Sequence, residues 1–275
     1  MKLRAVGIAA AFLLSGLILV GGLYAVGTLV LWPGTSPSTG ELVVLQSATI
    51  LAASAGLTWL FATRFVPLSA TDLRWRPGGA GDLLRGVLFG AAPAVAALVL
   101  GLLAGGRWTA DGGTFGAWLA SLVRLLALLA PAALAEELVF RGLPLVVLAR
   151  AFGAPTAIVL LALPFGLTHG LNPGATPLAV GNVVLAGVFL GAVFYLPGGL
   201  WTATGAHLGW NLALAGLAAP VSGLPVAVPG LDYEPGASTW LTGGAFGPEG
   251  GLLATLTLAA AAVLAARPFR RESTE

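Results

Sequence analysis

The sequence has no cysteine and few charged residues. The absence of cysteine excludes thiol catalysis, disulfides and thiolate metal sites. Only 9% of the 275 residues are charged and 57% are hydrophobic, so a soluble globule would have too little polar surface to stay dispersed in water. The formal net charge is only +2, and the basic residues are scattered at segment ends, which argues against a nucleic-acid partner. The composition therefore predicts a protein whose solvent is the lipid bilayer.

Apolar stretches long enough to cross a bilayer recur along the whole chain. Spanning ~30 Å of hydrocarbon takes about 20 apolar residues. The first stretch is too long for a signal-peptide apolar region of about 7 to 15 residues, so we expect a retained helix. We predict an all-α polytopic membrane protein, with about eight transmembrane helices in a single membrane-embedded domain over residues 1–275. The predicted spans are about residues 5–32, 42–63, 86–104, 115–150, 155–171, 178–196, 200–219 and 251–266.

Two other features of the chain interrupt this regular pattern. The fourth span is too long for one straight crossing, and we expect kinks at Pro131 and at Gly142-Leu143-Pro144. Residues 220–250 are rich in proline and glycine and are predicted to form a loop.

The distribution of basic residues predicts the orientation of the chain. An even number of crossings places both termini on one side of the membrane, and loops rich in Lys and Arg face the cytoplasm. We therefore expect both termini in the cytoplasm, and the short loops and composition suggest a bacterial plasma membrane. The residues expected inside are Lys2, Arg4, the cluster from Arg64 to Arg85 that includes Arg74 and Arg76, Arg150, and the tail with Arg267, Arg270 and Arg271. The residues expected outside are Asp232 and Glu234.

The fourth span carries three ionisable residues, Glu136, Glu137 and Arg141. Each such group costs ~3 kcal/mol or more at the centre of a membrane helix, so the cluster is a functional-site hypothesis by default. Glu137 and Arg141 are four residues apart, with the acid first, and are expected to form an ion pair. Glu136 lies about 100° round the helix from Glu137 and could point towards another partner. An unpaired buried carboxylate of this kind suits a general base.

The two histidines also lie in predicted spans, His169 in the fifth and His207 in the seventh. Glu136 lies 14 residues before Arg150 and His169 lies 14 residues after Pro155, which places both roughly 21 Å deep. His207 and Asn211, at i,i+4 spacing, point the same way.

Two mechanisms fit the side chains of Glu136, His169, His207 and Asn211 equally well on the sequence alone. A carboxylate and an imidazole can deprotonate a water while a second imidazole and an amide stabilise an oxyanion, which is a set of groups for peptide hydrolysis. Alternatively, Glu136, His169, His207 and Asn211 could ligate a divalent metal such as zinc, whose bound water would be the nucleophile.

Three motifs in order resemble a known family. Glu136 to Arg141 matches EExxxR, Phe165 to His169 matches FxxxH, and His207 to Asn211 matches HxxxN. Together they resemble the CPBP family of CAAX-protease and bacteriocin-processing (Abi) intramembrane proteases, in which metal dependence is described variously. The resemblance implies an endopeptidase with a catalytic core at about residues 115–219. Its Glu136 and His169 would activate water, His207 and Asn211 would steady the oxyanion, and Glu137 with Arg141 would support the site.

The sequence gives no support to other common protease chemistries but leaves other functional classes open. HExxH and GxSxG are absent from the sequence. The expected partners are the bilayer and a membrane-associated protein or peptide substrate, which could be lipidated. A non-catalytic protein for bacteriocin self-immunity or scaffolding is the main alternative. A transporter with a proton relay is a third, although the sequence shows neither repeated halves nor paired discontinuous helices.

Overall fold

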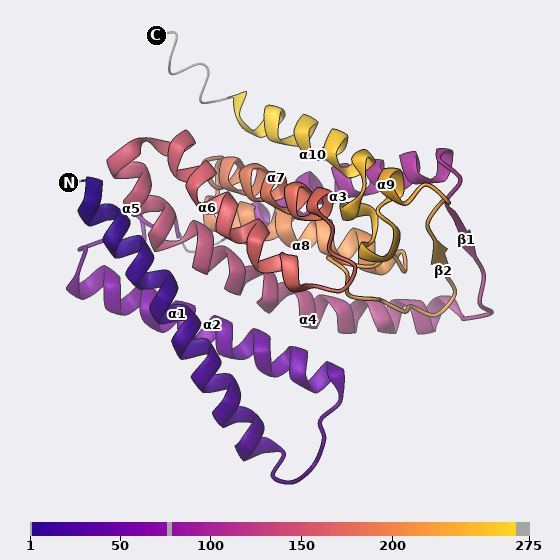
Figure 1. Cartoon of the computed structure of the whole chain (residues 1–275), viewed down its shortest axis with the longest axis horizontal. Helices are drawn as coiled ribbons and strands as arrows, with labels where there is room; N and C mark the ends of the chain where they lie inside the picture. Colours follow the sequence, from indigo (N-terminus) through magenta and orange to yellow (C-terminus); the bar gives the residue numbers. More distant parts are fainter. Residues whose placement is uncertain (1, 76–78, 268–275) are drawn as a thin grey trace.

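The computed structural model describes residues 2–75 and 79–267, and almost all of its regular structure is helical (Figure 1). The α-helices in these residues are α1 (Lys2–Leu31), α2 (Thr39–Arg64), α3 (Ala80–Leu103), α4 (Phe115–Arg141), α5 (Leu143–Phe152), α6 (Ala154–Thr168), α7 (Pro177–Phe194), α8 (Leu200–Gly216), α9 (Thr239–Thr242) and α10 (Leu252–Ala265). The remaining elements are the strands β1 (Arg107–Thr109) and β2 (Asp232–Glu234) and the 3₁₀ turns η1 (His169–Leu171), η2 (Gly244–Phe246) and η3 (Pro248–Gly250). The all-α prediction is confirmed. Arg76, Arg270 and Arg271 lie outside the described residues.

Each of the eight predicted spans corresponds to a helix or, for the fourth, to α4 and α5 together. Within the described residues, the segments long and apolar enough to cross a membrane are Lys2–Leu31, Gly40–Arg64, Ala80–Leu103, Phe115–Phe152, Ala154–Leu171 and Pro177–Phe194. The helices of the other two predicted spans, α8 and α10, are shorter, with 17 and 14 residues. The chain is therefore a multi-pass integral membrane protein.

The break between α4 and α5 lies at Gly142. Its φ of −70° and ψ of −126° are not helical, and Pro144 at the start of α5 has no N–H to continue the hydrogen-bond ladder of α4. The predicted kink at this position is confirmed, whereas α4 continues through Pro131. The sequence-based depth of Glu136 assumed one continuous helix as far as Arg150. That count is wrong, because the helix ends at this break.

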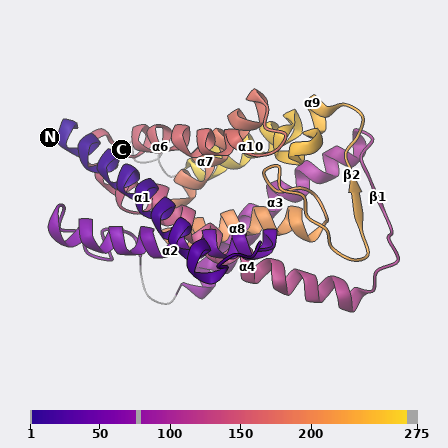
Figure 2. The same cartoon turned by 60° about the horizontal axis from the view of Figure 1, so that its bottom comes forward.

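Helix α8 lies at the centre of the bundle, where it packs against α3, α4 and α7 (Figures 1 and 2). Most of its residues are buried. Figure 1 shows α10, α7, α8 and α4 following one another across the bundle, with the α1–α2 hairpin beyond α4. Because protein surrounds α8 instead of lipid, this helix can carry polar side chains.

Glycines allow α3 and α8 to approach until their backbones touch. A Cβ on Gly209 would lie 2.1 Å from the carbonyl oxygen of Val87, and Gly90 and Gly205 have no room for a Cβ either. Small residues spaced by four positions are the usual means of close helix packing in membranes. His207 lies between the two α8 glycines, so this contact helps to fix its position.

A short antiparallel ribbon of β1 and β2 lies at the end of the bundle away from the first residues of α1 (Figure 1). Arg107 pairs with Glu234 in the ribbon, and the Arg107 Nε atom donates to Glu234 Oε2 at 2.8 Å. Trp108 donates its indole N–H to the carbonyl oxygen of Leu217 at 2.7 Å, which ties the ribbon to the end of α8. The segment predicted as a loop, residues 220–250, is thus interrupted by the short elements β2, α9, η2 and η3, which carry too little periodicity to be recognised from the sequence.

At the opposite end, the connection between α2 and α3 is tied to two other helices. Asp72 Oδ1 accepts a hydrogen bond of 2.5 Å from Arg150 Nη2 of α5. The Arg74 guanidinium donates to the carbonyl oxygens of residues 194–196, at the C-terminal end of α7, at 3.0 to 3.1 Å. Hydrogen bonds from Ser69, and then the charge of Arg150, hold the pKa of Asp72 below its usual value. Which end of the bundle faces the cytoplasm stays a prediction.

Candidate active site

The buried ion pair predicted within the fourth span is present in α4. Arg141 Nη1 donates to Glu137 Oε1 at 2.8 Å, and both side chains are almost fully buried. The same guanidinium donates through Nη2 to the carbonyl oxygen of Gly187 on α7 at 3.2 Å and lies 4.3 Å from the centre of the Phe165 ring on α6. The pair therefore joins α4 to α6 and α7 immediately beside the two histidines.

His207 on α8 lies between the two adjacent carboxylates of α4. Its Nδ1 atom is 2.9 Å from Glu137 Oε1, and its Nε2 atom is 4.0 Å from Glu136 Oε2. An ionised carboxylate only accepts hydrogen bonds, so Nδ1 carries a proton and Nε2 is directed towards Glu136. The ring orientation is thus fixed by the carboxylate that Arg141 already neutralises.

Glu136 has a buried oxygen that is not satisfied and that faces the histidine, and Oε2 of Glu137 is likewise buried without a partner among the described residues. The Oε2 atom of Glu136 is buried and has no hydrogen-bond partner in the part of the chain that the structure describes, although 31% of the whole side chain is exposed. Buried polar atoms are rarely left without a partner unless they serve a function or hold a water. Glu136 therefore has the free acceptor that a general base needs.

His169 lies at the C-terminal end of α6, where it begins the turn η1, and not within the helix. Its Nδ1 atom is 2.9 Å from the carbonyl oxygen of Phe165. Because a carbonyl oxygen can only accept, the hydrogen bond places the proton on Nδ1 and leaves the lone pair of Nε2 in the neutral ring. The last turn of α6 therefore presents an imidazole that can accept a proton.

A small cavity brings three of the predicted residues together, with space for water of about 30 Å³. His169, His207 and Asn211 line it, and its apolar lining includes Phe165 and Trp210. A volume of this size holds about one or two water molecules when polar partners are present. Glu136 is not among the lining residues and reaches the group from the α4 side, next to His207.

Glu249 and Ser222 also line this cavity, and the sequence analysis missed both. They come from the segment between α8 and α10, which carries no helical pattern around them. The only signal in the sequence was Glu249 itself, an isolated acid directly before an apolar span, and residue spacing could not assign a partner to it.

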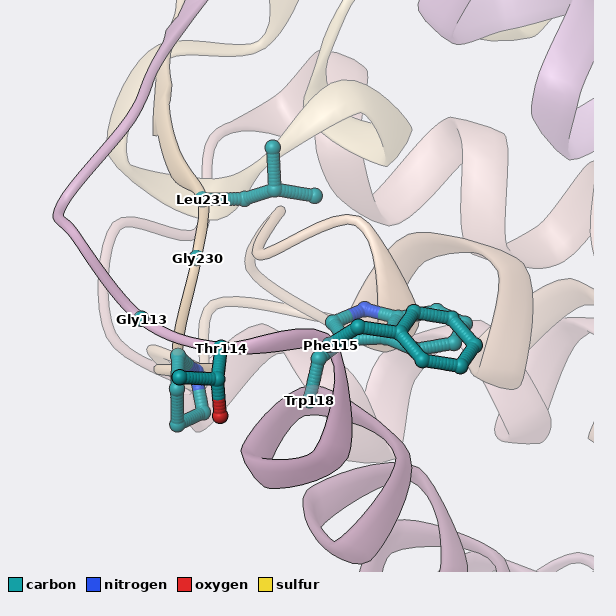
Figure 3. Close-up of a pocket in the computed structure, with 7 residues that line it drawn as sticks. Gly113, Thr114, Phe115, Trp118, Gly230 and Leu231 are labelled. Carbon is teal, nitrogen blue, oxygen red and sulfur yellow. The ribbon is translucent and has the colours of Figure 1, made fainter.

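A second, larger cavity of about 280 Å³ lies at the start of α4, and its lining includes none of the predicted site residues (Figure 3). The stacked rings of Phe115 and Trp118 form one side of it, and residues 229–231 form another. The one side-chain hydroxyl of this lining, that of Thr114, accepts a hydrogen bond from Ala117 N as the helix cap. These lining residues therefore offer no group suited to acid–base or nucleophilic chemistry.

Metal binding by Glu136, His169, His207 and Asn211 stays a prediction. Among residues 2–75 and 79–267, no three or more His, Asp or Glu side chains converge in a geometry that could hold one. Each imidazole is oriented through its Nδ1 atom, that of His207 by Glu137 and that of His169 by the Phe165 carbonyl, which leaves the two Nε2 atoms as the possible ligands or proton acceptors. The arrangement offers carboxylate, imidazole and amide groups around a water-sized space.

The fold and the cluster define a polytopic helical membrane protein with a buried glutamate–histidine site. Residues 116–213 match the family model of Type II CAAX prenyl endopeptidase Rce1-like proteins, a stretch that includes all three motifs discussed above. The match confirms the resemblance to the CPBP family and supports a CAAX-protease-like intramembrane endopeptidase in general. Neither the curated proteins nor the solved structures contain a match to the chain.

Proposed function

We propose that this protein is an intramembrane endopeptidase in which Glu136 and His169 activate a water molecule. The observation that carries the proposal is the water-sized cavity lined by His169, His207 and Asn211, next to a carboxylate with an unsatisfied buried oxygen. These groups come from α4, from the end of α6 and from α8, so only the folded chain assembles them.

In the first step, a water molecule in the cavity transfers a proton to the site as its oxygen attacks the scissile carbonyl carbon. Glu136 Oε2, which has no hydrogen-bond partner among the described residues, takes this proton, while His169 Nε2, which keeps its lone pair, accepts a hydrogen bond from the same water. The proton then passes to the amide nitrogen as the C–N bond breaks, and the second proton of the water passes from the new carboxylic acid through His169 to the amine, which gives a carboxylate and an ammonium product. Water is the only co-reactant that this step requires.

The negative charge that develops on the carbonyl oxygen is stabilised by His207 and Asn211. Both line the cavity one helical turn apart on α8. His207 can donate from Nε2 when its ring carries a second proton, and the carboxylates of Glu136 and Glu137 together balance the charges of His207 and Arg141. Asn211 donates through its amide group. Glu137 and Arg141 hold the His207 ring in the orientation that this role needs.

The substrate class follows from where the cavity lies. The site is enclosed by helices that cross the bilayer, so we propose a substrate segment that is itself membrane-associated and could carry a lipid. A farnesylated CAAX peptide is the natural first probe, given the family match of residues 116–213. A resident zinc ion is tested in the same assay with a chelator, because the metal interpretation predicts loss of cleavage on chelation.

The experiment is peptide-bond cleavage by the purified protein in detergent, measured with a quenched-fluorescence farnesylated CAAX peptide. Glu136→Gln and His169→Ala should each lower kcat by about 10²- to 10⁴-fold, the usual contribution of a general acid–base group. Glu234→Gln is the matched control, since it neutralises an exposed glutamate in the ribbon. If folded wild-type protein cleaves neither this probe nor a panel of membrane peptides, the immunity or scaffolding alternative replaces the protease proposal.

A further inference from the structure

Glu249 is a buried carboxylate that none of the three motifs contains and that lies outside the matched residues 116–213. It sits in η3, directly before α10, and is only 7% exposed. It lines the same cavity as His169, His207 and Asn211. A charge buried at this position is costly unless several donors satisfy it, so the network around it indicates what it does.

Both carboxylate oxygens of Glu249 accept hydrogen bonds from segments that form the cavity. Trp210 Nε1, on α8 beside Asn211, donates to Oε1 at 2.8 Å. Ser222 donates to Oε2 through its backbone N–H and through Oγ, the latter at 3.0 Å. The carboxylate therefore connects the helix that carries two of the proposed catalytic groups to the loop that follows it.

The same loop reaches the segment that carries His169. Asn172, three residues after that histidine, donates from Nδ2 to the carbonyl oxygen of Ser222 at 2.8 Å. A continuous chain of hydrogen bonds thus runs from Asn172 through Ser222 and Glu249 to Trp210. It links the segment after α6, on one side of the cavity, to α8 on the other.

The backbone of Glu249 is anchored as firmly as its side chain. Asn182 on α7 donates from Nδ2 to the Glu249 carbonyl oxygen at 2.7 Å and to the Gly251 carbonyl oxygen at 2.9 Å. Thr255 on α10 donates to Asn182 Oδ1 at 2.6 Å. The backbone that carries the carboxylate is therefore held to α7 and α10, beside the cavity.

We infer that Glu249 is a positioning residue of the active site, which sets the spacing between His169 on one wall of the cavity and Asn211 on the other. The inference rests on the proposed function for its catalytic consequence. Its structural content stands on the hydrogen bonds alone: the carboxylate fixes Ser222 beside Trp210 of α8, and Asn172, directly after η1, binds the same serine. A misplacement of about 1 Å between catalytic groups can cost about 100-fold in rate.

The first test compares Glu249→Gln with Glu234→Gln in the cleavage assay. In Glu249→Gln one acceptor oxygen becomes an amide nitrogen that only donates, so the side chain cannot accept from both Trp210 and Ser222. The chain of hydrogen bonds is then broken with little change in volume. We expect kcat per folded molecule to fall by between about 10- and 100-fold with little change in KM. Trp210→Phe, which removes one donor and no charge, should lower kcat in the same direction by less.

The second test does not depend on catalysis. The chain has no cysteine, so Leu171→Cys and Leu224→Cys introduce the only thiols, at positions that are 95% and 49% exposed. Spin labels on these sites report the distance between η1 and the Ser222 loop by pulsed electron resonance. The distance distribution should broaden in Glu249→Gln and in Trp210→Phe and stay narrow in Glu234→Gln.

The outcomes separate the two proposals. An unchanged distance distribution together with an unchanged kcat in folded Glu249→Gln protein overturns the positioning role. If the wild-type protein cleaves no peptide, the protease proposal fails, and the spin-label result alone decides whether Glu249 holds the loop. A broadened distribution then supports the structural role, and an unchanged one overturns it.

Discussion

Glu137 and His207 lie 70 residues apart in the chain and are joined by a contact of 2.9 Å between Glu137 Oε1 and His207 Nδ1. The same oxygen accepts from Arg141 at 2.8 Å, so one carboxylate atom connects the buried cation of α4 to the imidazole of α8. The adjacent Glu136 makes no such contact, and Oε2 of each glutamate is buried without a hydrogen-bond partner among the described residues. From the contacts of Glu137 with Arg141 and His207, we expect separate tasks for the two glutamates, a chemical one for Glu136 and a structural one for Glu137.

This division predicts different effects for two substitutions at adjacent positions. Glu137→Gln removes the charge that balances the buried Arg141, and an unpaired buried charge costs about 3 to 5 kcal/mol. We expect a large fall in the midpoint of thermal unfolding and, with it, in activity. Glu136→Gln should leave the midpoint close to that of the wild type while activity is lost. Thermal unfolding in detergent measures both.

Glu234→Gln serves as the control for the ion pair. It breaks the ion pair between Arg107 and Glu234. The Arg107 side chain is 68% exposed and that of Glu234 is 48% exposed, and exposed ion pairs contribute only about 0 to 1 kcal/mol to stability. If Glu137→Gln and Glu234→Gln lower the unfolding midpoint equally, the structural role assigned to Glu137 is contradicted.

The spans and the Glu137–Arg141 pair could be predicted because each depends on residues close in sequence. Apolar length locates a membrane helix, and a spacing of four residues places an acid and a base on one face. The contact between Glu137 and His207 depends on how α4 meets α8, which no local pattern records. Glu249 was missed for the same reason, since its partners come from three separate segments. The break at Gly142 could be predicted from the sequence, but its effect on the depth of Glu136 in the membrane could not.

The pH dependence of stability should show the contact between Asp72 and its neighbours. The folded-state pKa of Asp72 is depressed, so its contribution is present above the unfolded pKa of about 3.9 and is lost as the pH falls through the folded value. Asp72→Asn should therefore lower the unfolding midpoint at pH 7, and the difference from wild type should shrink as the pH falls below about 4. A difference that persists unchanged at low pH would contradict this account.

The predicted orientation can be tested by labelling single cysteines in this cysteine-free chain. Arg85 lies near the start of α3 and Glu234 in the ribbon at the other end of the bundle, and both side chains are substantially exposed. Because basic loops stay in the cytoplasm, a membrane-impermeant maleimide should label Glu234→Cys in intact cells and Arg85→Cys only after permeabilisation. The reverse pattern would place both termini outside.

The packing of α3 on α8 predicts opposite effects on stability for two glycine-to-alanine substitutions. In Gly209→Ala the new Cβ would lie 2.1 Å from Val87 O, so the helices must move apart, and overpacking of this kind costs about 1 to 3 kcal/mol. Gly181→Ala on α7 meets nothing within 4 Å and should be neutral or stabilising by up to about 1 kcal/mol, because alanine is the better helix former.

Gly209→Ala should also affect catalysis, because Gly209 lies two residues from His207. Separation of α8 from α3 would shift the imidazole relative to Glu137 on α4, so Gly209→Ala should lower kcat as well as the unfolding midpoint. Gly181→Ala should change neither by much. If Gly209→Ala protein unfolds and cleaves like the wild type, the backbone contact between α3 and α8 does not position the site.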